Sequence, residues 1–412
     1  MGSSPSKSVV MDELQEMEVA LRGKDLPGTM EEINKDLNAL KNTTVDIAIT
    51  GVSGAGKSSL VNALRGMTDD EEGAAESGVM QTTTALKGYP HPLFPNVMLW
   101  DLPGIGTSQF KAKEYLKTFS FKEYDLFIIV SSERFTENDV LLAREIHKIK
   151  KKFYYVRTKV DVSIDSERRR PNFSEENTLE KIRKYCCDNL SETGYSNPKV
   201  FLISRWDWSI YDFPLLYSAL ENDLDDLKRH VLIESMPGFS REIIRKKKAA
   251  MDALIWKVAL VSCGIRATPV PGFHLSCDIA FLEETMRYFC KVFAFDEFSL
   301  RRLAHWATIP FDELRSAVKR SPMASQITKE FVTDLLNKSM CAMTIEAEFI
   351  LDLIPVLGSL CGVVSFTTVF YMLKSFLYDV EEDAENIWAK AAEYVQPKPC
   401  TVPRTPQENR LK

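Results

Sequence analysis

The stretch G-V-S-G-A-G-K-S at residues 51–58 decides the fold, because it fits the pattern G-x-x-x-x-G-K-[S/T] between a strand-like run and a helical pattern. Its glycines let the backbone curl so that successive N–H groups face a phosphate, and the following helix adds the positive end of its dipole. Lys57 is expected to reach the β- and γ-phosphates, and Ser58 to hold Mg²⁺. The predicted phosphate site comprises Gly51, Gly54, Ala55, Gly56, Lys57, Ser58 and Ser59.

Strand and helix patterns alternate outward from this stretch. Runs of β-branched and aromatic residues predict five strands, at residues 45–50, 97–100, 126–130, 153–157 and 200–203. Helical patterns lie between them at residues 58–65, 138–152 and 175–189. Such crossovers predict an α/β P-loop domain, in which helices cover both faces of a mainly parallel sheet. Strand signals stop after residue 238, so a second, all-α domain is expected.

Composition limits the classes of partner and compartment. The 412 residues are 45% apolar and 27% charged, as in ordinary folded proteins, and long enough for two or three domains. A net charge of -6 argues against a nucleic-acid partner. Eight cysteines without C-x-x-C spacing or a preceding signal peptide favour reduced thiols and a cytoplasmic protein.

Two further motifs indicate which nucleotide binds. D-L-P-G at residues 101–104 supplies Asp101, a carboxylate for Mg²⁺, and Gly104, whose N–H is expected to sense the γ-phosphate. T-K-V-D at residues 158–161 resembles the guanine-recognition motif of GTPases, with Thr158, Lys159 and Asp161 as its fixed positions. A carboxylate there accepts two hydrogen bonds that guanine donates and adenine cannot, so guanine is predicted.

Two loops complete the predicted site. Among the threonines at residues 82–84, Thr83 is assigned to switch I, where it would meet Mg²⁺ and the γ-phosphate. We therefore expect Lys57, Thr83 and Gly104 to act in GTP hydrolysis. Ser204 follows the last strand, where the remaining guanine-contacting loop belongs. The acidic run at residues 69–72 is interpreted as a solvated loop.

With these motifs in place, the chain resembles the immunity-related GTPases, the interferon-inducible family, over nearly its full length. The resemblance rests on residues 56–58 with 64–66, on 94–97, on 100–106, on 153–161 and on 211–214. It implies GTP and GDP as ligands, self-association through the G domain in the GTP state, contact with related GTPases, and action on intracellular pathogen-compartment membranes. The Gly-Lys-Ser sequence of the P-loop resembles that of the effector subclass of this family.

The chain departs from the family pattern at four positions. Val52 and Gln81 stand where family members commonly carry glutamate, and Arg205 stands where they usually have asparagine. Ile105 follows Gly104, at the position where Ras-like GTPases place a water-orienting glutamine. Because isoleucine cannot hydrogen-bond water, intrinsic hydrolysis is expected to be slow and assisted in trans by a second copy.

The domain division follows from these patterns. Residues 1–42 are predicted to form a leader and two short helices, the second opened by Thr29 and Glu32 after a break at residues 27–28. Residues 43–235 form the G domain, and residues 236–395 form the helical domain together with the N-terminal helices. Residues 396–412, with four prolines, are expected to be a disordered tail.

Two features concern membranes. The N-terminus fits M-G-x-x-x-[S/T], which makes Gly2 a candidate for N-myristoylation and the protein a candidate for peripheral attachment to intracellular membranes. Residues 353–373 carry no charge and are long enough to span a bilayer, but Pro355 and Gly358 favour a buried helical hairpin. Two alternatives stay open: a GTP-regulated binding module with negligible hydrolysis, and an integral membrane GTP-binding protein.

Overall fold

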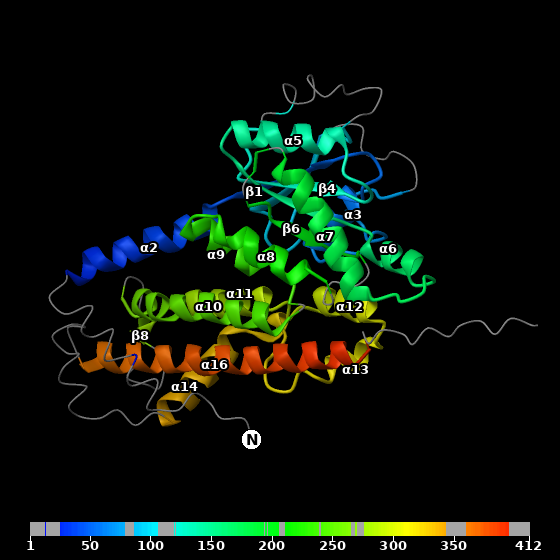
Figure 1. Cartoon of the computed structure of the whole chain (residues 1–412). Coiled ribbons are helices and arrows are strands. Elements are labelled where there is room, and N and C mark those ends of the chain that lie inside the picture. The colour runs from blue at the N-terminus through cyan, green and yellow to red at the C-terminus, as the bar shows by residue number, and fades with distance from the viewer. Residues whose placement is uncertain are drawn as a thin grey trace, which may run out of the picture.

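The computed structural model describes residues 13, 25–78, 86–105, 119, 121–192, 194–195, 197–205, 211–238, 240–264, 268–269, 276–342 and 360–394. Two layers are visible in Figure 1, an α/β part above and a bundle of long helices below. The α/β part ends with helix α9 (Asp226–Ser235), and the helical part continues with α10 (Arg241–Ser262). This is the predicted combination of an α/β P-loop domain with an all-α domain.

A six-stranded sheet forms the centre of the α/β part, with the strand order β2-β3-β1-β4-β5-β6. Its strands are β1 (Val45–Gly51), β2 (Lys87–Pro90), β3 (Val97–Asp101), β4 (Leu126–Ser131), β5 (Lys152–Arg157) and β6 (Val200–Leu202). The five predicted strands are confirmed and pair in parallel. Strand β2 was not among the predicted strands; it pairs antiparallel with β3 at the sheet edge, where Pro90 is tolerated.

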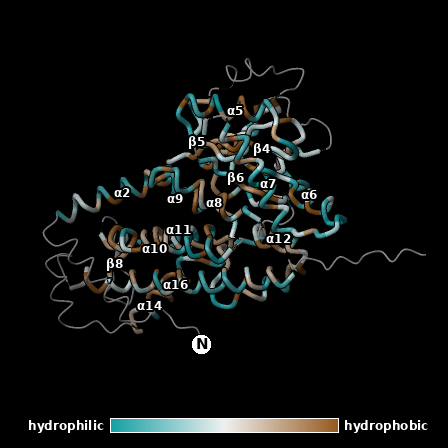
Figure 2. The backbone as a smooth tube through the Cα atoms, in the orientation of Figure 1, coloured by the Kyte–Doolittle hydropathy of each residue, from teal (hydrophilic) through white to brown (hydrophobic). Residues whose placement is uncertain are grey.

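Helices cover both faces of the sheet, so alternate residues of each strand enter different cores. Ile47 and Ile49 belong to a hydrophobic cluster that continues into the helical part, whereas Ala48 belongs to a second cluster beneath α5 and α7. The helices are α3 (Lys57–Leu64), α5 (Glu137–Lys148), α6 (Val160–Glu167), α7 (Glu175–Ser191), α8 (Phe213–Asn222) and α9. Figure 2 shows apolar segments gathered in the sheet between these helices.

The helical part is built around α10 and α16 (Leu360–Tyr394), which lie side by side. Around this pair lie α11 (Ile279–Val292), α12 (Glu297–Ala307), α13 (Phe311–Arg315) and α14 (Lys329–Ala342). A short antiparallel pair, β7 (Thr268–Pro269) with β8 (Ser276–Cys277), corrects the expectation that this region contains no strand. The buried Asp383 of α16 accepts backbone hydrogen bonds from Lys319, Arg320 and Ser321 and so fixes the loop after α13.

Helix α2 (Leu26–Asn42) packs on α9 and α10, in agreement with an N-terminal contribution to the helical part. The predicted break at residues 27–28 is wrong, because both residues lie in the first turn of α2. Asp25 caps the helix by accepting a hydrogen bond from the Gly28 N–H at 3.2 Å. Proline fits the first turn, since an N–H there has no intrahelical partner.

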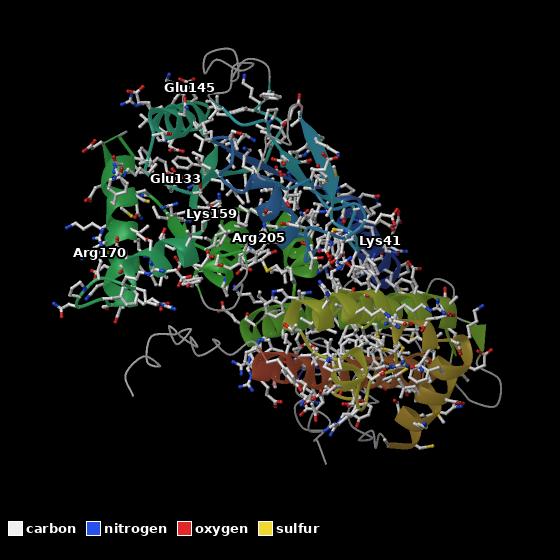
Figure 3. All side chains as sticks on the ribbon, turned by 90° about the vertical axis from the view of Figure 1, so that its right-hand side faces the viewer. Lys41, Glu133, Glu145, Lys159, Arg170 and Arg205 are labelled. Atoms are coloured by element: carbon white, nitrogen blue, oxygen red, sulfur yellow. The ribbon has the colours of Figure 1, made fainter. Side chains whose placement is uncertain are left out.

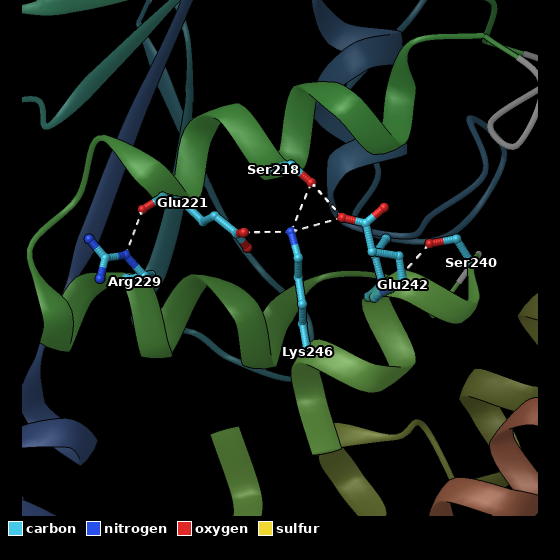
Figure 4. A network of polar contacts seen from close by, with 7 residues as sticks. Ser218, Glu221, Arg229, Ser240, Glu242 and Lys246 are labelled. Atoms are coloured by element: carbon cyan, nitrogen blue, oxygen red, sulfur yellow. Dashed lines mark hydrogen bonds and ion pairs between the residues drawn. The ribbon is translucent and has the colours of Figure 1, made fainter. Parts of the chain in front are cut away.

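A lysine on α10 ties the two parts together. Lys246 Nζ donates to Ser218 Oγ at 2.8 Å and lies 3.2 Å from Glu242 Oε1 (Figure 4). It also donates to Glu221 Oε1 of α8, whose side chain is almost fully buried. The contacts join α8 of the α/β part to α10 by charge-assisted hydrogen bonds, which are stronger than neutral ones.

The uncharged segment at residues 353–373 is described from residue 360 onward, where it forms the start of α16. Most of its side chains from Val363 to Leu373 are buried in the helical part, as predicted for a core position. The predicted turn at Pro355 and Gly358 lies outside the described residues. The helix from Gly362 to Tyr394 is long and apolar enough to cross a membrane, yet most of its apolar stretch is buried inside the protein.

Candidate nucleotide-binding site

The P-loop, residues 51–58, lines a cleft of ≈ 1400 Å³ at the carboxyl ends of the parallel strands. Gly51 has a φ of 143°, and a Cβ at this position would lie 2.1 Å from the Val130 carbonyl oxygen. Gly56 has a φ of 90° and forms the left-handed N-cap of α3. These two positions therefore require glycine, and they turn the backbone into the N-terminus of α3 as the sequence predicts.

Lys57 occupies the interior of the P-loop. Its Nζ donates to the Val52 carbonyl oxygen at 3.1 Å, and its side chain is almost fully buried. Burial lowers the pKa of Lys57, and the nearby Asp101 carboxylate opposes that shift. A buried ammonium held by a backbone carbonyl is suited to receive the negative charge of phosphates.

Ser58 and Asp101, the two described residues that the sequence predicts to hold Mg²⁺, lie together beneath the P-loop. Ser58 Oγ is 2.6 Å from Asp101 Oδ2, and both residues are buried. A hydroxyl and a carboxylate are the oxygen ligands that Mg²⁺ prefers, so the two residues fit this ion. Ser58 would ligate Mg²⁺ and Asp101 would hold its water shell, and the ion would there neutralise phosphate charge.

The T-K-V-D motif contacts the P-loop directly. Thr158 Oγ1 donates to the Ala55 carbonyl oxygen at 2.6 Å and lies 3.2 Å from the Ser131 carbonyl oxygen. Lys159 has a φ of 55° and its Nζ donates to the Gly54 carbonyl oxygen at 3.0 Å. Figure 3 places Lys159 near Arg205 on the same face of the α/β part. Thr158 and Lys159 thus hold the P-loop against β5.

Asp161 carries an acceptor suited to a base. Its Oδ1 is buried and accepts no hydrogen bond from any of the residues that the structure describes. A buried acceptor without a partner is destabilising unless a ligand or water supplies a donor. Asp161 adjoins Thr158 and Lys159, which line the cleft, but is not itself among the lining residues, and its role as the acceptor for guanine stays a prediction.

Ser204 is buried at the rim of the same cleft. Asp212 contacts Leu202, the last residue of β6, just before Ser204; in the sequence Asp212 belongs only to the stretch 211–214 that carries the family resemblance. Asp212 Oδ2 accepts from the Leu202 N–H at 2.7 Å and from Arg183 Nη2 of α7 at 2.6 Å. An acid ten residues after a strand carries no signal of this contact, because the partner on α7 becomes adjacent only in the folded chain.

The interpretation of residues 69–72 as a solvated loop is wrong for two of its four acids. Asp69 accepts from Asn62 Nδ2 at 2.8 Å and pairs with Arg205 Nη2 at 2.8 Å. Glu71 pairs with Arg302 of α12 at 2.8 Å. Asp70 and Glu72 are exposed, as expected. The loop therefore contacts both the guanine loop and the helical part.

Gly104 and Ile105 lie against the P-loop. A Cβ on Gly104 would approach the Ser53 backbone to 2.8 Å, so only glycine fits. The Ile105 N–H donates to the Gly51 carbonyl oxygen at 3.1 Å, and its side chain is 2% exposed within the second hydrophobic cluster. Ile105 thus points into the core and offers no group to water. Thr83, Gln81 and Gly2 lie outside the described residues.

This fold and this site define a P-loop GTPase. The family model of the interferon-inducible GTPases matches residues 10–391. The chain is 40% identical to interferon-inducible GTPase 5 of Rattus norvegicus over 385 residues, covering 93% of this chain and 83% of that protein. It is 36% identical to interferon-gamma-inducible GTPase 10 of Mus musculus, covering 93% and 90%.

The chain belongs to the interferon-inducible GTPase family, and it is a GTPase. Among solved structures, Toc33 from Arabidopsis thaliana in complex with GDP and Mg²⁺ has a TM-score of 0.31 and 16% identity, covering 44% of this chain and 78% of that one.

Proposed function

We propose that this GTPase binds GTP with Mg²⁺, hydrolyses it slowly as a single copy, and self-assembles through its G domain in the GTP state. The observation that carries the proposal is the position of Ile105, which is buried and bonded to Gly51. The position after Gly104 therefore supplies no side chain to orient the attacking water. We propose that a second copy, or a related GTPase, supplies the missing assistance to GTP hydrolysis.

We further propose that the assembled protein acts on intracellular membranes of pathogen compartments in innate immunity, as the family resemblance implies. Attachment would begin at Gly2, within the M-G-x-x-x-[S/T] pattern. A single myristoyl chain gives only marginal, reversible membrane binding. Assembly would strengthen it, because linked copies gain avidity without new contacts.

The test is GTP turnover per molecule across a protein dilution series, with and without liposomes. Turnover should rise with protein concentration in wild type and be absent in Lys57→Ala. A flat series at low turnover would instead support the alternative, a GTP-regulated binding module with negligible hydrolysis. Val52 and Ile105 are the described residues that favour this alternative.

Membrane attachment is tested separately by flotation of N-myristoylated protein with liposomes. Wild type should float mainly with GTP and be stripped by alkaline carbonate, whereas Gly2→Ala should stay at the bottom. Ser3→Ala is the matched control, since it changes a neighbouring position that the pattern leaves free. If Gly2→Ala floats and resists carbonate, the integral-membrane alternative through α16 is correct.

A further inference from the structure

A second cavity, of ≈ 90 Å³, lies where the α/β part meets the helical part. Arg65, at the C-cap of the P-loop helix α3, contributes from one side. Lys247 of α10 and residues of α12 contribute from the other, and α12 lies on the side of the helical layer that faces the α/β part (Figure 1). This cavity is separate from the nucleotide cleft and no role in GTP binding accounts for it.

Positive charge exceeds negative charge around this cavity. Among the residues that the structure describes, three basic side chains line it, Arg65, Lys247 and Arg302, against one carboxylate, Glu234. Glu234 Oε1 lies 3.1 Å from His230 Nε2, and the negative charge of Glu234 also acts on Lys247 and Lys291. Glu71, which does not line the cavity, pairs with Arg302. The remaining walls are mainly apolar, which leaves the net positive charge poorly solvated.

Two side chains on one face of α12, Arg302 and Ser299, carry donor groups that make no hydrogen bond to any residue the structure describes. The Arg302 side chain is 9% exposed, and among the described residues neither its Nε nor its Nη2 makes a hydrogen bond. Its Nε lies 2.8 Å from Glu71 Oε2 without hydrogen-bond geometry. Ser299 Oγ, three residues earlier on α12, is also buried without a hydrogen bond in the described part of the chain. Residues three apart share a helix face.

The buried His91 also lines the cavity and is affected by the same positive charges. Burial lowers its pKa well below the ordinary value, and the charges of Lys247, Arg65, Arg302 and Lys291 lower it further. His91 Nδ1 accepts hydrogen bonds from the Leu93 and Phe94 N–H groups, as a neutral imidazole can. The histidine therefore adds no further charge. Burial also lowers the pKa of Lys247 to about 7, so at neutral pH the excess positive charge rests mainly on Arg65 and Arg302.

We propose that this cavity binds a tetrahedral oxyanion of the phosphate class, held by Arg302, Ser299 and the charges of Arg65 and Lys247. Its volume equals the space that about three waters occupy, and one such anion fills a comparable space. Water could satisfy the open donors, but it would leave the excess positive charge uncompensated. An oxyanion supplies both acceptors and negative charge. Bound there, it bridges the P-loop helix α3 to α12.

Sulfate and inorganic phosphate are the probes, titrated by calorimetry and thermal shift into the full chain saturated with GDP and Mg²⁺, at constant ionic strength. Saturable binding should persist in Lys57→Ala, which weakens the P-loop. It should weaken about tenfold or more in Arg302→Gln, because a charge-assisted bond is lost. Arg301→Gln, next to it but exposed and paired with Glu297, is the matched control and should bind like wild type.

Ser299→Ala removes one hydroxyl, so it tests the site even if Arg302→Gln fails to fold, and binding should weaken about threefold or more.

Phosphatidylcholine vesicles with and without phosphatidic acid separate the two sources of a phosphate group. Arg302-dependent binding of phosphatidic acid vesicles would identify a headgroup, and binding of the free ions alone would identify a free oxyanion. The proposal is overturned if no probe binds saturably, or if binding disappears in Lys57→Ala and persists in Ser299→Ala.

Discussion

Replacing Thr158 by valine tests how the guanine motif supports the P-loop. The substitution keeps the shape of the side chain and exchanges its hydroxyl for a methyl group. Thr158 is buried, and its Oγ1 is 2.6 Å from the Ala55 carbonyl oxygen. Ala55 is itself fully buried, so in Thr158→Val its carbonyl loses this donor without gaining water.

The magnitude follows from this burial. A buried acceptor left unsatisfied costs about 1–3 kcal/mol. Without nucleotide, the P-loop can relax and expose that carbonyl to water, whereas bound nucleotide requires the P-loop to stay in place. Most of the penalty should therefore appear in binding, as a dissociation constant for GDP raised roughly 5- to 150-fold.

The assay is titration with a fluorescent GDP analogue, together with thermal unfolding to establish that the variant folds. Thr158→Ser keeps the hydroxyl and is the matched control, for which we expect affinity within about threefold of wild type. Equal GDP affinity in Thr158→Val, Thr158→Ser and wild type would refute the reasoning, because the hydroxyl would then have no part in holding the P-loop.

Other variants test the remaining parts of the site by the same titration. Lys57→Ala should abolish tight GTP binding while unfolding as wild type does, and wild-type affinity would disprove its phosphate role. Asp161→Asn should shift preference from guanine to xanthine nucleotides, and a variant that keeps guanine and refuses xanthine places base recognition elsewhere. Asp212→Ala should weaken GDP binding about tenfold by releasing the Ser204 loop, and an unchanged constant would show that the loop needs no anchor. Arg205→Asn should change GDP affinity by less than about fivefold, because the Arg205 side chain is 41% exposed and such ion pairs contribute little.

Much of the fold was predictable because its signals are local. Buried parallel strands such as β4 are continuous apolar runs, and the P-loop has a fixed spacing of glycines before a lysine. Strand β2 was missed for the opposite reason, since a run of Lys, Gly, Tyr and Pro has low strand propensity. It forms because β3 offers an unpaired edge, which is a property of the sheet and not of residues 87–90.

The parts of the site that the sequence did not predict depend on distant partners. Nothing near Asp69 or Glu71 indicates Arg205 or Arg302 as counterions, and the local pattern of four acids is typical of an exposed loop. The environment of Ile105 also depends on distant residues. Its residue type alone shows that it cannot orient water, but its hydrogen bond to Gly51 requires β1 and β3 to lie side by side. Motif positions were predictable, and the contacts that orient them were not.

The packing of α16 bears on the membrane proposal. A bilayer would receive the apolar side chains of α16 at little cost, but the helices that α16 now covers would lose their partner. Met251, Ile255 and Val258 of α10 belong to the same hydrophobic cluster, and exposing each costs roughly 1.5–3 kcal/mol. The sum of about 5–9 kcal/mol for these three alone approaches the whole stability of a typical domain, about 5–15 kcal/mol. Insertion of α16 would therefore remove a large part of the core of the helical part, which is why the proposed attachment is assigned to Gly2 and assembly.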